Sequence, residues 1–126
     1  MTQQRTLTIT LQPDWRAALR AAGATAGRAT GYQGEMLNFE SPGALFSRLT
    51  ERRWALVHAL QGRGPMAVRE LARRVGRDVK RVHEDVQVLA ELGLVERDAA
   101  GGVVCPFAEV HIDLHLRAPA ELAARA

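Results

Sequence analysis

The stretch over residues 68–107 constrains the fold most, because it carries two helical patterns separated by one glycine. Four apolar residues of the first pattern recur at the spacing of one helix face: Val68, Leu71, Ala72 and Val75. Gly76 follows at once, where a turn between helices often needs a positive φ. Asp78 is then a good N-cap. The sequence therefore predicts two helices joined by a tight turn.

The second helix is predicted to have a buried face and a polar face. Its apolar stripe consists of Val79, Val82, Val86 and Leu89. The opposite face carries long polar side chains that can reach base edges or phosphates: Arg77, Lys80, Arg81, His83, Glu84 and Gln87. After Gly93, residues 94–97 and 103–105 read as the strands of a hairpin with its turn at residues 98–102. This order is the outline of a winged helix-turn-helix, a module that lays one helix in the DNA major groove.

The charge distribution supports a DNA-binding role for this unit. Between Arg48 and Arg81 the chain has ten basic and three acidic residues, a local balance of +7, whereas the rest of the chain carries −4. Positive charge is therefore concentrated where the phosphate backbone would be bound. The predicted DNA-binding residues are Arg69, Arg73, Arg77, Lys80, Arg81, His83, Glu84, Gln87 and Arg97.

Three segments, Glu51–Leu60, residues 69–86 and residues 89–98, resemble the winged-helix transcriptional regulators of the MarR and ArsR type. Among these, the chain resembles a prokaryotic group of small MarR-like DNA-binding proteins. The resemblance covers roughly residues 41–116 and implies a DNA-binding regulator, with an antitoxin-like size and layout. One position departs from it: Arg77 follows the turn glycine where many relatives have an apolar residue. We expect Val79 to supply the missing contact.

Residues 1–40 are predicted to form a strand-helix-strand extension. Residues 6–11 alternate between polar and apolar, as in a strand with one buried face. Pro13 and Asp14 suit the first turn of a helix. Residues 35–40 read as a second strand with Leu37 and Phe39 on one side. We expect this extension to form a dimer or to bind a partner.

Two more helices are expected before the helix-turn-helix. Ser41 and Pro42 should begin the first as N-cap and N1 residue, and Thr50 should cap the second, over residues 51–61. The side chains expected to point inward are Leu45, Phe46 and Leu49 in the first helix, and Trp54, Val57 and Leu60 in the second.

A last strand is predicted over residues 110–116, where polar and apolar residues alternate again. An isolated hairpin is marginal in water, so this strand needs a partner, and residues 6–11 are the candidate, within one chain or across a dimer. The predicted fold class is α+β. A winged helix-turn-helix domain spans residues 41–117, the β-α-β extension spans residues 1–40, and residues 118–126 form a tail.

Other functional classes find little support. His111, Asp113 and His115 alternate on one strand face, and neighbouring positions lie about 7 Å apart, so three ligands do not easily converge on a metal. Cys105 is the only cysteine, which excludes an internal disulfide and a cysteine-based zinc site. No P-loop, GxGxxG or Ser-His-Asp pattern is present. We therefore expect no enzyme and no cofactor. Without an apolar run of about 18 residues or a signal peptide, we expect a cytoplasmic protein.

The sequence thus predicts a sequence-specific DNA-binding transcriptional regulator. Because one recognition helix reads only a few base pairs, a homodimer on two half-sites is expected, with repression by steric block. An antitoxin that represses its own operon and binds a toxin is one form of this hypothesis. The alternative is a winged-helix protein-interaction subunit that does not bind DNA. That alternative would be favoured if Arg73, Arg77 and Arg81 were held in internal salt bridges.

Overall fold

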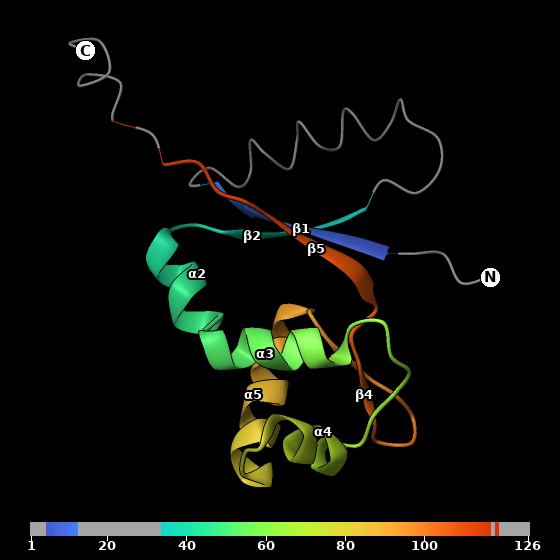
Figure 1. The fold of residues 1–126 in the computed structure, drawn as a ribbon. Helices are drawn as coiled ribbons and strands as arrows, with labels where there is room; N and C mark the ends of the chain where they lie inside the picture. Colours follow the sequence, from blue (N-terminus) through green and yellow to red (C-terminus); the bar gives the residue numbers. More distant parts are fainter. Residues whose placement is uncertain (1–4, 13–33, 117, 119–126) are drawn as a thin grey trace.

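The computed structural model describes residues 5–12, 34–116 and 118, and these form an α+β fold. The elements are β1 (Arg5–Leu11), β2 (Glu35–Phe39), α2 (Pro42–Arg48), α3 (Glu51–Leu60), α4 (Val68–Val75), α5 (Val79–Leu92), β3 (Glu96–Arg97), β4 (Val103–Val104) and β5 (Phe107–Asp113). Figure 1 shows the sheet of β1, β2 and β5 at one end and α4 with the start of α5 at the other. The helix expected to begin at Pro13 and most of the tail after residue 117 lie outside the described residues.

The larger sheet joins the two ends of the chain. Its strand order is β2-β1-β5, and β1 is parallel to both neighbours. Ile9 at its centre is aligned with Leu37 on one side and Ile112 on the other. The predicted pairing of residues 6–11 with the last strand is therefore confirmed within one chain. β5 begins at Phe107 and ends at Asp113, earlier at both ends than predicted.

The helix α2 connects this sheet to the helical part. Ser41 Oγ accepts a hydrogen bond from the Ala44 amide at 3.1 Å, which confirms the predicted N-cap. Leu45 and Leu49 are buried as expected. Phe46 is 61% exposed, so its predicted inward position is wrong. Successive helical residues lie about 100° apart, and a helix this short packs only one side against the core.

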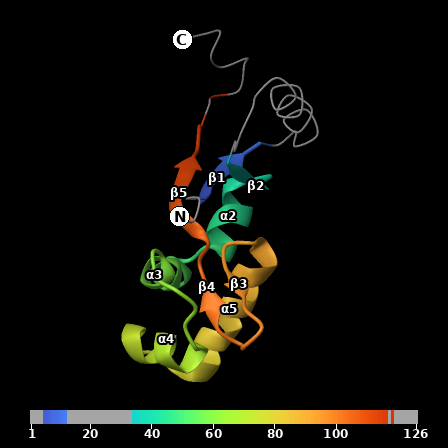
Figure 2. The ribbon, with the colours of Figure 1, turned by 90° about the vertical axis from the view of Figure 1, so that its right-hand side faces the viewer.

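Helices α3, α4 and α5 pack around a shared apolar centre (Figure 2). The predicted caps are confirmed, because Thr50 and Asp78 accept hydrogen bonds from the amides three residues ahead. Gly76 ends α4 with φ +69°, a left-handed conformation that suits glycine. The buried side chains of these helices are Leu56, Val57, Leu60, Leu71, Ala72, Val82, Val86 and Leu89. They belong to the same core as Leu7, Ile9 and Phe39 of the sheet.

Val79 does not belong to this core. Its side chain is 43% exposed, so the prediction that it continues the buried stripe of α5 is wrong. Val79 is the first residue of the helix and lies beyond the end of the apolar centre, one turn before Val82.

The hairpin of β3 and β4 is shorter than predicted. Leu94 and Val95 are buried but precede the paired residues, which begin at Glu96. Asp98 fixes the turn, since its Oδ1 accepts from the amides of Gly102 at 2.6 Å and Ala100 at 3.1 Å. Val103 also exchanges two backbone hydrogen bonds with Met66, which brings the chain before α4 alongside β4. No helix among the described residues is long and apolar enough to cross a membrane.

Candidate nucleic-acid interface

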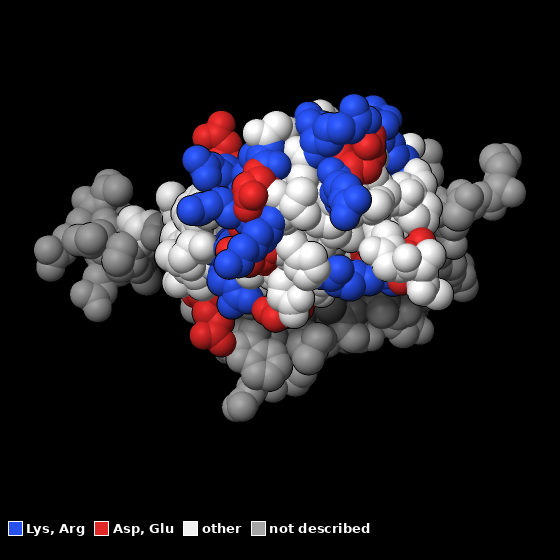
Figure 3. Space-filling model, turned by 90° about the horizontal axis from the view of Figure 1, so that it is seen from below, with Lys and Arg blue, Asp and Glu red and all other residues white. Residues whose placement is uncertain are grey.

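The end of the molecule formed by α4 and the first turn of α5 is rich in basic side chains. Figure 3 looks onto this end and shows Lys and Arg side chains at several places, interspersed with Asp and Glu side chains and uncharged atoms. The exposed basic residues of the two elements are Arg69, Arg73 and Arg74 on α4, and Lys80 and Arg81 on α5. We call these five side chains the basic face.

Four of the nine predicted DNA-binding residues are exposed cations with no ion pair among the described residues. Arg69, Lys80, Arg81 and Arg97 are exposed, and none of them makes an ion pair within the described part of the chain. Three belong to α4 and α5, whereas Arg97 belongs to the β3 strand of the hairpin, which lies beside α5 (Figure 2). Exposed, unpaired cations of this kind are the groups that bind phosphate oxygens.

Arg73 is paired but remains accessible. Its guanidinium donates two hydrogen bonds to Glu70, at 2.9 and 2.6 Å, and the side chain is 75% exposed. Arg74 donates to the same carboxylate at 3.1 Å. The hydrogen bonds from Arg73 and then Arg74 lower the pKa of Glu70. Because the pair is local and solvated, it contributes little stability, and a phosphate can compete for Arg73.

Arg77 points inward and differs from the other predicted residues. Its Nη2 lies 2.7 Å from one oxygen of Asp85, while Arg53 Nε of α3 lies 3.0 Å from the other oxygen. The Arg77 and Asp85 side chains are only 19% and 15% exposed. Burial alone would raise the pKa of Asp85, but the hydrogen bonds from Arg77 and Arg53 lower it further than burial raises it. This cluster of three side chains, the Asp85 cluster, ties the turn and α3 to α5.

The Asp85 cluster explains how the turn accommodates a charged residue where an apolar one was expected. Local sequence patterns could not reveal this cluster, because Arg53 and Asp85 are 32 positions apart. Arg77 Nη1 is buried without a hydrogen-bond partner among the described residues, so the guanidinium is fixed by one side only. Arg77 is therefore placed to hold α5 in position, not to reach outward.

The remaining predicted residues lie along the outside of α5. At about 100° per residue, Lys80, Glu84 and Gln87 are furthest from the buried stripe, and Arg81 and His83 lie at its two sides. All five are exposed. Gln87 Nε2 is 3.5 Å from Glu91 Oε1, one turn further on. The polar side of the helix thus presents both donors and acceptors, as base edges require.

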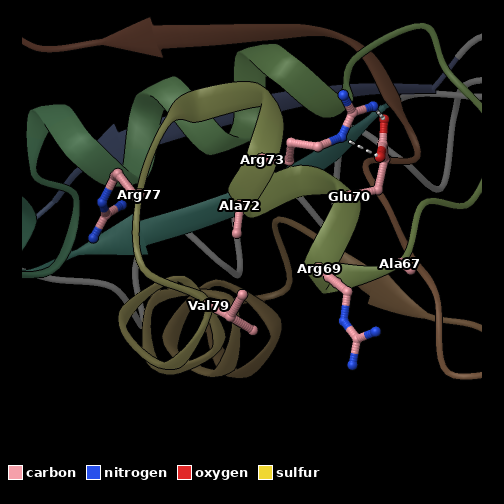
Figure 4. A pocket seen from close by; sticks show the side chains of 7 residues that line it. All are labelled: Ala67, Arg69, Glu70, Ala72, Arg73, Arg77 and Val79. Carbon is pink, nitrogen blue, oxygen red and sulfur yellow. Dashed lines mark hydrogen bonds and ion pairs between the residues drawn. The ribbon is translucent and has the colours of Figure 1, made fainter.

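A shallow hollow lies between α4 and α5 at the edge of the basic face (Figure 4). The residues that line it are Ala67, Arg69, Glu70, Ala72, Arg73, Arg77 and Val79. Ala72 and Val79 point toward each other across it, one from each helix, and Arg69 lies at its rim (Figure 4). The hollow therefore combines an apolar floor with a charged rim, on which three arginines outnumber the one carboxylate of Glu70.

The other candidate site consists of His111 and Asp113 on β5 and of His115, which follows the end of that strand. His115 Nε2 lies 2.7 Å from Asp113 Oδ1, and both side chains are largely exposed. Among the residues that the structure describes, no three His, Cys, Asp or Glu side chains are grouped so that they could hold a metal ion. Cys105 is buried, and burial raises the pKa of its thiol.

Comparison with known proteins places the chain in one family. No curated protein matches the chain, and no solved structure does. The family described as HVO_A0114 matches residues 48–112, a segment that runs from the end of α2 to β5 and contains the basic face, the Asp85 cluster and the hairpin. Since this segment is more than half of the 126 residues, the chain belongs to the HVO_A0114 family.

Proposed function

We propose that this chain is a sequence-specific DNA-binding transcriptional regulator that uses α4, α5 and the β3–β4 hairpin as a winged helix-turn-helix. The observation that carries the proposal is the set of exposed cations without ion pairs on α4, α5 and the hairpin: Arg69, Lys80, Arg81 and Arg97. Exposed side chains without a structural partner contribute little to folding. Three of them, Arg69, Lys80 and Arg81, lie together on α4 and the first turn of α5, and a polyanionic ligand best explains this grouping.

The geometry of the two helices supports duplex DNA as that ligand. In a helix-turn-helix, the first residues of the second helix contact base edges while the first helix crosses the backbone. Here α5 begins on the basic face with Lys80 and Arg81 in its first turn, and α4 carries Arg69 and Arg73 beside it. The Asp85 cluster holds α5 at a fixed angle to α3, which a reading helix requires.

We propose further that the chain acts as a homodimer that represses transcription by steric block. One α5 helix covers only a few base pairs, and a two-fold pair would place two such helices about 34–36 Å apart on two half-sites. β5 is an edge strand of the larger sheet, and its outer edge has no strand partner among the described residues. Pairing of two such edges is one way to form the dimer.

A second candidate is a winged-helix protein-interaction subunit that does not bind DNA. Internal pairing of Arg73 with Glu70 and of Arg77 with Asp85 favours it. The third residue that this alternative needs in an internal pair is Arg81, and its side chain has none among the described residues. This difference makes Arg81 the informative position.

Fluorescence anisotropy with the full chain tests the proposal. A duplex is first selected from a random-sequence library with the purified protein and then labelled. Arg81→Ala should weaken its binding at least about fivefold, as the loss of one base or phosphate contact does. Arg52→Ala is the matched control, because Arg52 is exposed on α3, outside the two helices that carry the basic face, and should bind within about twofold of wild type. If no duplex is selected, the protein-interaction alternative is preferred. If a duplex is selected but both variants bind it alike, a DNA contact by Arg81 is refuted.

A further inference from the structure

Val79 is an apolar side chain in an unusual place. It is 43% exposed at the first position of α5, between the N-cap Asp78 and the cation Lys80. Exposed valines are common on protein surfaces and need no explanation when they stand alone. Val79 is different because it forms part of the apolar floor of the hollow between α4 and α5, with three arginines and one carboxylate around it: Arg69, Arg73, Arg77 and Glu70.

The surroundings of Val79 indicate what kind of molecule can cover it. A purely apolar partner would have to desolvate the guanidinium groups of Arg69 and Arg73 without replacing their interactions with water. A partner with negative charge around a small apolar group would satisfy both parts of the site. The major groove of DNA has this character where a thymine is present, because its 5-methyl group lies between two phosphate backbones.

We propose that Val79 reads a thymine in the bound DNA by packing against the 5-methyl group of that base. The inference rests on the proposed DNA-binding function and adds a base preference to it. Val79 has no hydrogen-bonding atoms in its side chain, so it cannot distinguish bases through donors and acceptors. Apolar contact with the thymine methyl group is the one form of direct readout open to such a side chain.

The position of Val79 on its helix agrees with this role. The first residues of a reading helix are the ones that contact base edges. Lys80 and Arg81 follow directly and can bind the flanking phosphates or a guanine on either side of the thymine. Ala72 faces Val79 from α4 but is only 1% exposed (Figure 4). Of these two apolar residues of the floor, Val79 is therefore the one that a ligand can contact.

The test compares thymine with deoxyuridine, which lacks only the 5-methyl group. The probe is the tightest duplex that the full chain selects from a random-sequence library, with each thymine replaced in turn by deoxyuridine. Loss of one buried methyl group should weaken binding of the wild type about fourfold at one or two positions in each half-site. Val79→Ser should show no such loss at those positions, whereas the control Val79→Ile, which keeps the apolar contact, should retain it.

The outcomes distinguish the thymine contact of Val79 from DNA binding itself. If the wild type binds the duplex but deoxyuridine has no effect anywhere, the thymine contact is refuted and the DNA-binding proposal stands. If Val79→Ser keeps the same deoxyuridine penalty, another residue makes the contact and the assignment to Val79 is refuted. If no duplex binds at all, the proposed function itself fails. Thermal midpoints of both variants should stay near that of wild type, because position 79 lies outside the core.

Discussion

Replacing Asp85 by asparagine should destabilise the protein, because this carboxylate holds two arginines from different parts of the fold. Arg77 and Arg53 lie 2.7 and 3.0 Å from its two oxygens, and all three side chains are at most 20% exposed. Asparagine keeps one acceptor oxygen, so one guanidinium retains a weaker hydrogen bond and the other loses its partner. A charge-assisted hydrogen bond contributes about 1.5–3 kcal/mol, and a stranded buried charge adds to the loss. With the discount for partial exposure, we expect a loss of about 2–3 kcal/mol.

Urea unfolding at pH 7, followed by circular dichroism, measures this change directly. In a separate thermal unfolding experiment, the midpoint should fall by about 8–12 °C, taking about 4 °C for each kcal/mol in a domain of this size. Lys80→Ala and Arg81→Ala serve as controls and should change the free energy of unfolding by less than about 0.5 kcal/mol, since both side chains are exposed. Wild-type stability in the asparagine variant would refute the claim that Asp85 holds the turn to α5.

The difference between wild type and the Asp85→Asn variant should also depend on pH. The pKa of Asp85 is lowered in the folded state, so its contribution is fully present above the ordinary aspartate pKa of about 4. The contribution is then lost as the pH falls through the lower folded pKa. Urea midpoints of the two proteins should therefore converge below pH 4, and a constant gap down to pH 2 would contradict the pairing.

Two further predictions concern the core and the turn. Ile9→Ala should cost about 2–5 kcal/mol and should lower one single unfolding transition, because Ile9 is fully buried in the core that the sheet shares with the helices. Two separate transitions by calorimetry would show that the sheet and the helices unfold independently. Gly76→Ala should cost about 1 kcal/mol, because the residue has φ +69° but an added Cβ would meet no atom within 4 Å. A loss beyond about 3 kcal/mol on urea unfolding would mean that more than backbone strain is involved.

Much of the local structure could be predicted from the sequence because it depends on near neighbours. The caps at Ser41, Thr50 and Asp78 and the left-handed glycine at position 76 involve residues only a few positions apart. Alternation of apolar residues likewise predicted the strands that became β1 and β5. These caps, turns and strands depend on local backbone geometry, so tertiary contacts did not change them.

The features that were mispredicted or missed depend on contacts distant in sequence. Helical periodicity cannot tell where the core ends, so Phe46 and Val79 were assigned to buried faces that do not extend to them. The inward position of Arg77 required a carboxylate on α5 and a second arginine on α3. The pairing of β1 with β5 was predicted, but the parallel direction of the strands and the pairing of β1 with β2 were not, because alternation predicts a strand without its direction.

The salt dependence of DNA binding tests the central claim most directly, because it counts the cations that meet phosphates. With Arg69, Lys80, Arg81 and Arg97 free to neutralise one phosphate each, the slope of log K against log salt should be about −3.6 per bound protomer. The Lys80→Ala variant should make the slope shallower by about 0.9, whereas Arg52→Ala on α3 should leave it unchanged. Anisotropy titrations of the full chain between 50 and 200 mM salt, roughly the range over which such contacts weaken, provide the slope. A slope near zero, or one that Arg52→Ala lowers as much as Lys80→Ala, would contradict DNA binding through α4, α5 and the hairpin.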